Sequence, residues 1–222
     1  MRLRRIVKPV LDRVMPPLWR WYVRKPRTAR RGDVRVTVPP GVFHPGLFIS
    51  TRFMMQHLAQ HDLVGKSLLE LGAGSGMVAI VAAKQGAVVT ATDISGLATA
   101  AIQANAAANK VQLAVFQADL FEGLPLSKFD FIAINPPYYP SDPSTEAEHA
   151  WFCGKDFEYF QRLFRDLGGY VHPHSQVFMV LSEDCKIDHI GKLALANGWQ
   201  MNILSQRTKW GERNYIFGIS KA

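Results

Sequence analysis

A glycine-rich turn is the first stretch of the sequence whose residue types could do chemistry. Glu70-Leu71-Gly72-Ala73-Gly74-Ser75-Gly76 follows a short apolar run and precedes a segment with helical spacing. Glycines at every second position let the chain turn tightly and let a ligand approach the backbone. Asp93 ends the next apolar run, where its carboxylate can accept hydrogen bonds from both hydroxyl groups of a ribose. The two features together predict a nucleotide site at the carboxyl ends of neighbouring strands.

A second candidate for chemistry is the tetrapeptide Asn135-Pro136-Pro137-Tyr138, which follows the apolar run 129–134. Two prolines fix an extended turn and offer carbonyl groups without N–H donors. Such a turn suits a planar amino group that donates both of its hydrogens while its nitrogen lone pair attacks an electrophilic methyl group. Orientation and charge complementarity would then carry the reaction, and no strong base is required. The ring of Tyr138 offers a face on which a planar group can stack.

The spacing of the glycines distinguishes between two kinds of nucleotide. A nicotinamide-binding turn has the pattern G-x-G-x-x-G, whereas here the third glycine comes one position early, as Glu70-x-Gly72-x-Gly74-x-Gly76. This pattern resembles motif I of the class I S-adenosylmethionine-dependent methyltransferases. The tetrapeptide resembles the N-P-P-Y motif of the amino-methyltransferases that act on planar nitrogens.

The resemblance implies a role for each matching residue. Glu70 would lie near the aminopropyl end of S-adenosylmethionine, Asp93 would bind the ribose, and Asp119 would cap the adenine amino group. The implied cofactor-binding set is Glu70, Gly72, Ala73, Gly74, Gly76, Asp93, Ile94, Asp119, Leu120 and Asn135. The implied catalytic set is Asn135, Pro136, Pro137 and Tyr138. No metal is expected, because no Cys/His cluster has zinc-site spacing and His172-Pro173-His174 is better explained as a turn before a strand.

Residues 150–156, Ala-Trp-Phe-Cys-Gly-Lys-Asp, narrow the resemblance further. They are similar to the segment after the catalytic motif of HemK-like protein-glutamine methyltransferases, which usually reads Gly-Gly-x-Asp-Gly. Here Cys153 replaces the first glycine and Phe157 replaces the last, and the helical domain with which bacterial HemK enzymes recognise release factors is not seen. The likeness covers about residues 42–220. It implies a methylated planar nitrogen on a protein glutamine or a small molecule.

Alternating apolar runs and helical periodicities predict the elements that must position these residues. A doubly wound, Rossmann-like α/β domain is expected at 42–222, with a mostly parallel seven-stranded sheet and an antiparallel strand from a C-terminal hairpin. The expected strands are 67–71, 87–92, 112–117, 129–134 and 176–181, with a hairpin at 200–205 and 214–219. The expected helices are 50–60, 77–85, 97–109, 156–167 and 184–197. The segment 41–51, with His44, Ser50 and Thr51, is expected near the cofactor, and loop 139–149 is expected to act as a lid.

Residues 1–41 are expected to form a basic arm and linker. Residues 1–35 hold 12 of the 26 Lys and Arg residues but two of the 18 acidic residues. Apolar residues from Leu3 to Leu18 recur at helical spacing, and Trp19, Trp21 and Tyr22 follow them. This pattern is typical of an amphipathic helix on an anionic membrane surface, although the stripe could equally pack on the domain, with RNA binding as a third role. Residues 26–41 suggest a linker or edge element.

Composition limits the other classes of function. With 48% hydrophobic and 20% charged residues, the chain is globular rather than disordered. Two cysteines do not make a disulfide framework, and no apolar run approaches the roughly 18 residues of a membrane span. A cytoplasmic protein is expected, with peripheral contact at the inner membrane surface through residues 1–25. Two alternatives remain open: a methyltransferase for the exocyclic amine of an RNA or DNA base, and a non-catalytic protein that binds cofactor or a partner.

Overall fold

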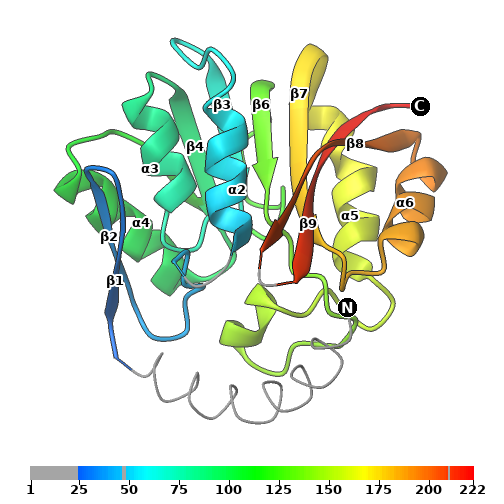
Figure 1. Cartoon of the computed structure of the whole chain (residues 1–222), viewed down its shortest axis with the longest axis horizontal. Helices are drawn as coiled ribbons and strands as arrows, with labels where there is room; N and C mark the ends of the chain where they lie inside the picture. The colour runs from blue at the N-terminus through cyan, green and yellow to red at the C-terminus, as the bar shows by residue number, and fades with distance from the viewer. Residues whose placement is uncertain (1–24, 47–48, 210) are drawn as a thin grey trace.

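The central feature of the computed structural model, which describes residues 25–46, 49–209 and 211–222, is a seven-stranded sheet (Figure 1). Its strand order is β5-β4-β3-β6-β7-β9-β8. Neighbours from β5 to β7 are parallel, whereas β9 is antiparallel to both β7 and β8. The bounds are β3 (Ser67–Leu71), β4 (Val88–Asp93), β5 (Ala114–Gln117), β6 (Phe129–Ile134), β7 (Val171–Ser182), β8 (Trp199–Lys209) and β9 (Glu212–Lys221). The predicted fold class is therefore confirmed.

Helices cover both faces of the sheet because alternate side chains of each central strand point to opposite sides. Leu68 and Phe131 pack with one set of helices, and their chain neighbours Leu69 and Ile132 pack with the other. The first set is α2 (Ile49–Leu58), α3 (Met77–Lys84) and α4 (Gly96–Ala108). The second is α5 (Glu158–Asp166) and α6 (Ile187–Ala196), with the 3₁₀ turns η1 (Glu146–Ala150) and η2 (Leu167–Tyr170) in the connecting segments. Every predicted helix is present within a few residues of its expected bounds.

A separate antiparallel hairpin corrects the prediction for residues 26–41. Strands β1 (Arg27–Arg31) and β2 (Val34–Val38) form a two-stranded sheet, and the valines of β2 are buried in the same core as α3 and α4. Asn105 of α4 hydrogen-bonds to the backbone of β2 as a neighbouring strand would. Its side chain accepts from Thr37 N at 2.8 Å and donates to Thr37 O at 2.8 Å. The segment is therefore part of the packed domain and not a linker, and the core begins at β1 rather than at residue 42.

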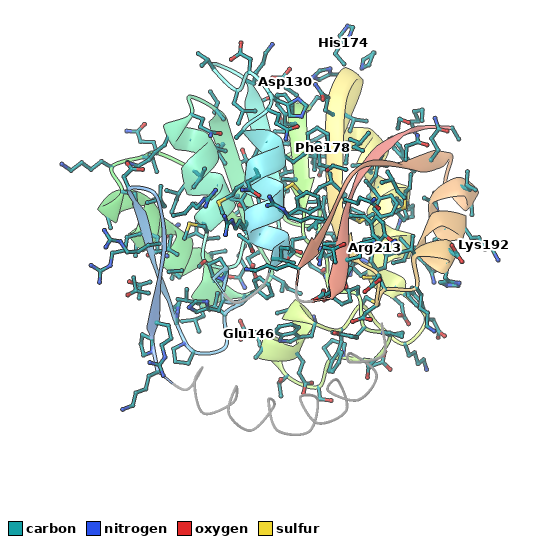
Figure 2. All side chains as sticks on the ribbon, viewed as in Figure 1. Asp130, Glu146, His174, Phe178, Lys192 and Arg213 are labelled. Atoms are coloured by element: carbon teal, nitrogen blue, oxygen red, sulfur yellow. The ribbon has the colours of Figure 1, made fainter. Side chains whose placement is uncertain are left out.

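The His172-Pro173-His174 segment also differs from its prediction. It lies inside β7 rather than in a turn before it, at a register shift where the partner of Phe129 is Val171 and the partner of Phe131 is Gln176. Figure 2 shows His174 beside Asp130 at the upper edge of the sheet, opposite Glu146 below the carboxyl ends of the strands. The described residues contain no group of three or more His, Cys, Asp or Glu side chains arranged to hold a metal.

Two observations concern the basic arm. The predicted amphipathic stripe from Leu3 to Leu18 lies outside the described residues, as do Trp19, Trp21 and Tyr22. Within the described part of the chain, each helix is too short or too polar to cross a bilayer.

Candidate active site

A cavity of about 390 Å³ lies at the carboxyl ends of β3, β4, β5 and β6. This volume is in the range of small-molecule pockets, roughly 300–1,000 Å³. Ten of the thirteen predicted site residues line it, namely Gly72, Gly74, Asp93, Ile94, Asp119, Leu120, Asn135, Pro136, Pro137 and Tyr138. The structure therefore brings together the ends of four strands that the sequence could relate only by order. The other three residues, Glu70, Ala73 and Gly76, lie outside this cavity.

Asp93 organises one wall of the cavity. Its Oδ2 accepts a hydrogen bond from Gly74 N at 2.8 Å, and its Oδ1 accepts one from Ser95 N at 3.0 Å. Burial raises the pKa of the Asp93 carboxyl, while these two backbone N–H groups act in the opposite direction. Each carboxylate oxygen keeps a further lone pair. The same carboxylate thus holds the glycine turn and can still accept hydrogen bonds from a ligand in the cavity.

The glycine turn leaves room for a ligand. Gly72 has a φ of 69°, which favours glycine, and a Cβ added there would meet no atom within 4 Å. A Cβ at Gly74 would stand 3.6 Å from the Cβ of Phe43, so segment 41–43 closes the turn from above. Gly76 instead permits close packing, because a Cβ there would stand 3.1 Å from Ile102 of α4. The bare backbone beside a fixed carboxylate fits the sugar end of a nucleoside cofactor.

Glu70 is buried behind the glycine turn, with 7% of its surface exposed. Its Oε2 accepts a hydrogen bond from Ala79 N at 2.7 Å and so satisfies an N–H group in the first turn of α3. Burial raises the pKa of this carboxyl to about 8. Glu70 lines a small cavity of about 20 Å³ that also touches Gly72, Ala73 and Asn135. The Glu70 side chain therefore supports the glycine turn, and it meets the cofactor site only through this small cavity.

Asp119 forms an ion pair that sequence reasoning did not anticipate. Its Oδ2 accepts a hydrogen bond from Arg162 Nη1 at 2.7 Å, and Arg162 also lines the cavity. Arg162 comes from α5, so its meeting with Asp119 depends on how that helix packs across the sheet. No local sequence motif predicts the pair of Asp119 and Arg162. The nearest signal is that Arg162 follows Tyr159 by three residues, and Tyr159 also lines the cavity.

The tetrapeptide 135–138 is tied to the segment that follows the loop. The N–H groups of Tyr138 and Tyr139 both donate to Trp151 O, at 3.2 and 3.0 Å, and Cys153 N donates to Tyr139 O at 3.0 Å. The Trp151 ring in turn lies 5.5 Å from that of Phe43. These contacts fix the direction of the turn 135–138.

Loop 139–149, the expected lid, contributes side chains to the cavity wall. Asp142, Pro143, Glu146 and His149 of loop 139–149 line it, and Glu146 is seen below the sheet in Figure 2. The segment before α2 contributes differently from the expectation. Ser50 lines the cavity, but His44 and Thr51 do not. Because α2 begins at Ile49, Ser50 lies in its first turn.

The reactive end of the cavity offers acceptors rather than a base. Within the described residues, the Asn135 side chain and the Pro136 carbonyl accept no hydrogen bond from the protein. Burial raises the pKa of the Tyr138 phenol well above its usual range, so the phenol stays neutral. The turn 135–138 can therefore orient a donor of two N–H bonds, and none of its four side chains is an ionised base.

Comparison with known proteins agrees with this geometry. The family model described as methyltransferase small domain matches residues 33–189. A candidate protein N5-glutamine methyltransferase of Methanocaldococcus jannaschii is 31% identical over 144 residues, which cover 62% of this chain and 71% of that protein. The ribosomal protein L11 methyltransferase of Thermus thermophilus is 32% identical over 133 residues, 60% of this chain, so the match spans half the length of that relative.

A solved structure shows the same fold with ligands. The 16S rRNA N2 G1207 methyltransferase of T. thermophilus, in complex with AdoMet and guanosine, has a TM-score of 0.60 at 19% identity, covering 87% of this chain and 50% of that one. With the family model covering most of the chain and a nucleoside-sized cavity at the expected strand ends, this protein belongs to the small methyltransferase domain family and is an S-adenosylmethionine-dependent methyltransferase.

Proposed function

We propose that the enzyme methylates a planar nitrogen, and that the acceptor is the side-chain amide of a protein glutamine or a small molecule with such a nitrogen. The observation that carries this proposal is the pair of open acceptors, Asn135 Oδ1 and Pro136 O, at one end of the cofactor cavity. A site for a carboxylate or hydroxyl acceptor would need hydrogen-bond donors or a base at this point. The two prolines of the turn have no N–H to donate, and the Tyr138 phenol is protonated and so cannot act as a base.

The proposed roles follow from the positions of the side chains. The cofactor supplies a methyl group bonded to a positively charged sulfur. Asp93 would accept from the ribose hydroxyls, and the oxygen of Asp119 that Arg162 leaves open would accept from the adenine amino group. Glu70 is proposed to face the aminopropyl end only through the narrow cavity beside Gly72.

At the reactive end, the residues of the turn would orient the acceptor nitrogen and would not remove a proton from it. Asn135 Oδ1 and Pro136 O would each accept one N–H of the acceptor, which directs the nitrogen lone pair toward the methyl carbon. As the N–C bond forms and the S–C bond breaks, the nitrogen gains positive charge and becomes acidic. Its proton can then leave to water, so the enzyme needs no strong base. The Tyr138 ring would hold the planar group by stacking.

A protein glutamine is favoured by the likeness to the M. jannaschii relative, which covers 71% of that protein. The alternative acceptor is the exocyclic amine of a nucleic-acid base, which presents the same planar donor pair. The basic residues of segment 1–35 favour it. The acidic side chains Asp142 and Glu146 of loop 139–149 oppose it, because their negative charge beside the cofactor cavity would repel nearby phosphates.

The test of the proposed function is the Asn135→Ala variant, assayed with labelled S-adenosylmethionine in a cell extract separated into protein, RNA, DNA and small-molecule fractions. We expect turnover to fall by at least about a hundredfold, since a positioned acceptor is lost, while the cofactor dissociation constant changes less than twofold. Label in hydrolysed protein as N-methylglutamine supports the amide acceptor. Label in RNA or DNA bases contradicts it, and an equal change in turnover and cofactor affinity contradicts the orienting role.

We also propose that residues 1–25 attach a cytoplasmic enzyme to the inner membrane surface. The support is the sequence pattern alone, a cationic and apolar helical stripe followed by aromatic residues.

A further inference from the structure

A second cavity, of about 270 Å³, lies beyond the catalytic turn. It shares Ser50, Asn135 and Tyr138 with the cofactor cavity, and no other lining residue. The second cavity therefore meets Asn135 and Tyr138 from the side away from the cofactor cavity. This makes it a suitable place for an acceptor to approach Asn135 while the cofactor occupies the first cavity.

The wall of this cavity is strongly cationic. Arg30 and Arg31 come from β1, Arg52 from α2 and Lys209 from the end of β8, against one acidic lining residue, Glu212. Within the described chain, none of the three arginines makes an ion pair or a side-chain hydrogen bond. Their guanidinium groups are planar forks that match carboxylates and phosphates. The sequence does not reveal this cluster, because its members come from β1, α2 and the distant end of β8.

Glu212 is held in a fixed position on the opposite wall. Its Oε1 accepts from Ser182 Oγ at 2.8 Å and from Asn214 Nδ2 at 3.3 Å, and both partners are buried. Its negative charge is one of the causes that raise the pKa of Tyr138, after burial and the neighbouring Tyr139, so it lies close to the catalytic turn. The Oε2 of Glu212 can accept an N–H from a bound chain and repels an anion placed deep in the cavity.

Strand β1 offers a second feature suited to a polypeptide. Ala29, Arg30 and Arg31 are consecutive, yet all three line the cavity. Side chains of a strand alternate between two faces, so a cavity that meets three in a row meets the strand at its edge. Among the described strands β1 pairs only with β2, which leaves its other edge available for an extended segment.

We propose that the second cavity binds an extended, acidic segment of a protein substrate. The segment lies along the edge of β1, its Asp or Glu side chains pair with Arg30, Arg31 and Arg52, and its glutamine amide reaches Asn135. The inference rests on the proposed function, which supplies the glutamine. A polynucleotide is disfavoured, because Tyr138 is the one aromatic face on the described lining and successive bases would need more such faces for stacking.

The test compares two triple variants that each remove three positive charges. The cavity variant is Arg30→Gln, Arg31→Gln, Arg52→Gln. The control variant is Lys110→Gln, Lys128→Gln, Lys192→Gln, whose lysines are exposed and line none of the three cavities. Both are made in the full chain, so the basic arm is the same in each. The probes are fluorescent 12-residue peptides with one glutamine among either glutamates or serines, and a 12-nucleotide single-stranded RNA, each measured with S-adenosylhomocysteine present.

We expect the wild type and the control variant to bind the acidic peptide at least tenfold more tightly than the serine peptide. The cavity variant should lose at least tenfold of its affinity for the acidic peptide, with an unchanged dissociation constant for S-adenosylmethionine. Equal peptide affinities of the two triple variants would overturn the inference. The inference would also be overturned if RNA bound more tightly than the acidic peptide and only the cavity variant lost affinity for RNA.

Methyl transfer into the same peptides separates this inference from the proposed function. If the acidic peptide binds through the arginines and its glutamine is not methylated, the binding inference stands and the glutamine acceptor fails. If the glutamines of both peptides are methylated at the same kcat/KM, the acceptor stands and the acidic specificity fails.

Discussion

Asp93 combines two roles in a single carboxylate. It anchors the glycine turn through Gly74 N and the start of α4 through Ser95 N, and it faces the cofactor cavity with its remaining lone pairs. The negative charge matters for both, because hydrogen bonds to an ionised acceptor are about twice as strong as neutral ones. A substitution here is therefore expected to change affinity and local order together.

The first prediction concerns Asp93→Ala. Loss of the charge-assisted bonds should weaken the binding of S-adenosylmethionine by at least about tenfold, as measured by titration calorimetry. The matched control is Asp130→Ala, at the opposite edge of the sheet, where the carboxylate accepts from Ser67 N and Oγ. That variant should lose stability and keep its cofactor affinity. Unchanged affinity in Asp93→Ala would remove this residue from the cofactor site.

The second prediction concerns the buried Glu70. Its pKa is about 8 in the folded protein, against 4.5 as the ordinary value. Between these values the unfolded chain has released a proton that the folded chain still holds, so stability falls as the pH rises from about 4.5 to 8. Glu70→Gln keeps an acceptor for Ala79 N and removes this titration. Relative to the wild type, the variant should gain at least about 1 kcal/mol of unfolding free energy between pH 5 and pH 8 in urea titrations. Parallel pH profiles would contradict the raised pKa.

At the scale of elements, α2 contributes both to the site and to the core. Its first turn carries Ser50 and Arg52 to the two cavities, and its last turn places His57 against Phe178. His61, three residues after the helix, lies against Phe131 and Phe178. Neither ring nitrogen of His57 has a hydrogen-bond partner within the described residues. Burial lowers the pKa of His57, with the nearby His61 acting in the same direction, and burial also lowers that of His61.

The third prediction follows from the lowered pKa of His57. The unfolded chain takes up a proton near pH 6.5 while the folded chain does not, so stability falls as the pH drops below that value. His57→Phe keeps an aromatic ring beside Phe178, 4.6 Å away in the wild type, and should lose less stability between pH 7 and pH 5. Thermal unfolding at both pH values measures this. His174→Phe, at an exposed position, is the control and should follow the wild type.

The elements also show how much of the fold can be predicted from the sequence. Continuous apolar runs such as 129–134 predict buried parallel strands, and the C-terminal hairpin follows from two runs around Trp210-Gly211. The sequence did not predict the β1–β2 hairpin as part of the core, because its five-residue strands lie among arginines and prolines. Its stability comes from Asn105 and Asn109 of α4, which bond to its backbone about 70 residues away. In the same way, the Arg162–Asp119 pair depends on packing and not on spacing.

At the scale of the whole molecule, positive charge is concentrated toward the N-terminus. The β1–β2 hairpin limits the position at which the chain can be cut to remove the basic arm. A cut at residue 30 would remove most of β1 and expose the buried valines of β2, whereas a cut after residue 24 leaves both strands intact.

The fourth prediction compares the full chain with residues 25–222. The truncated chain should fold and bind S-adenosylmethionine as the full chain does, because the described core and both cavities lie within it. The full chain should sediment with vesicles containing anionic lipid, and salt should weaken this binding. The truncated chain should remain in solution. An unfolded truncated chain would show that the arm packs on the domain, and failure of both chains to sediment would exclude the membrane role.

The bonds from Tyr138 N and Tyr139 N to Trp151 O have a consequence for the order of events in a catalytic cycle. Segment 139–154 lines the cofactor cavity and is hydrogen-bonded to the turn 135–138, so a displacement that opened the cavity on this side would break the contacts that hold Asn135 in place. We therefore expect ligand exchange and methyl transfer to need different positions of this segment. Initial-rate kinetics should then show a compulsory sequence, in which the cofactor binds before the acceptor and its demethylated product leaves last.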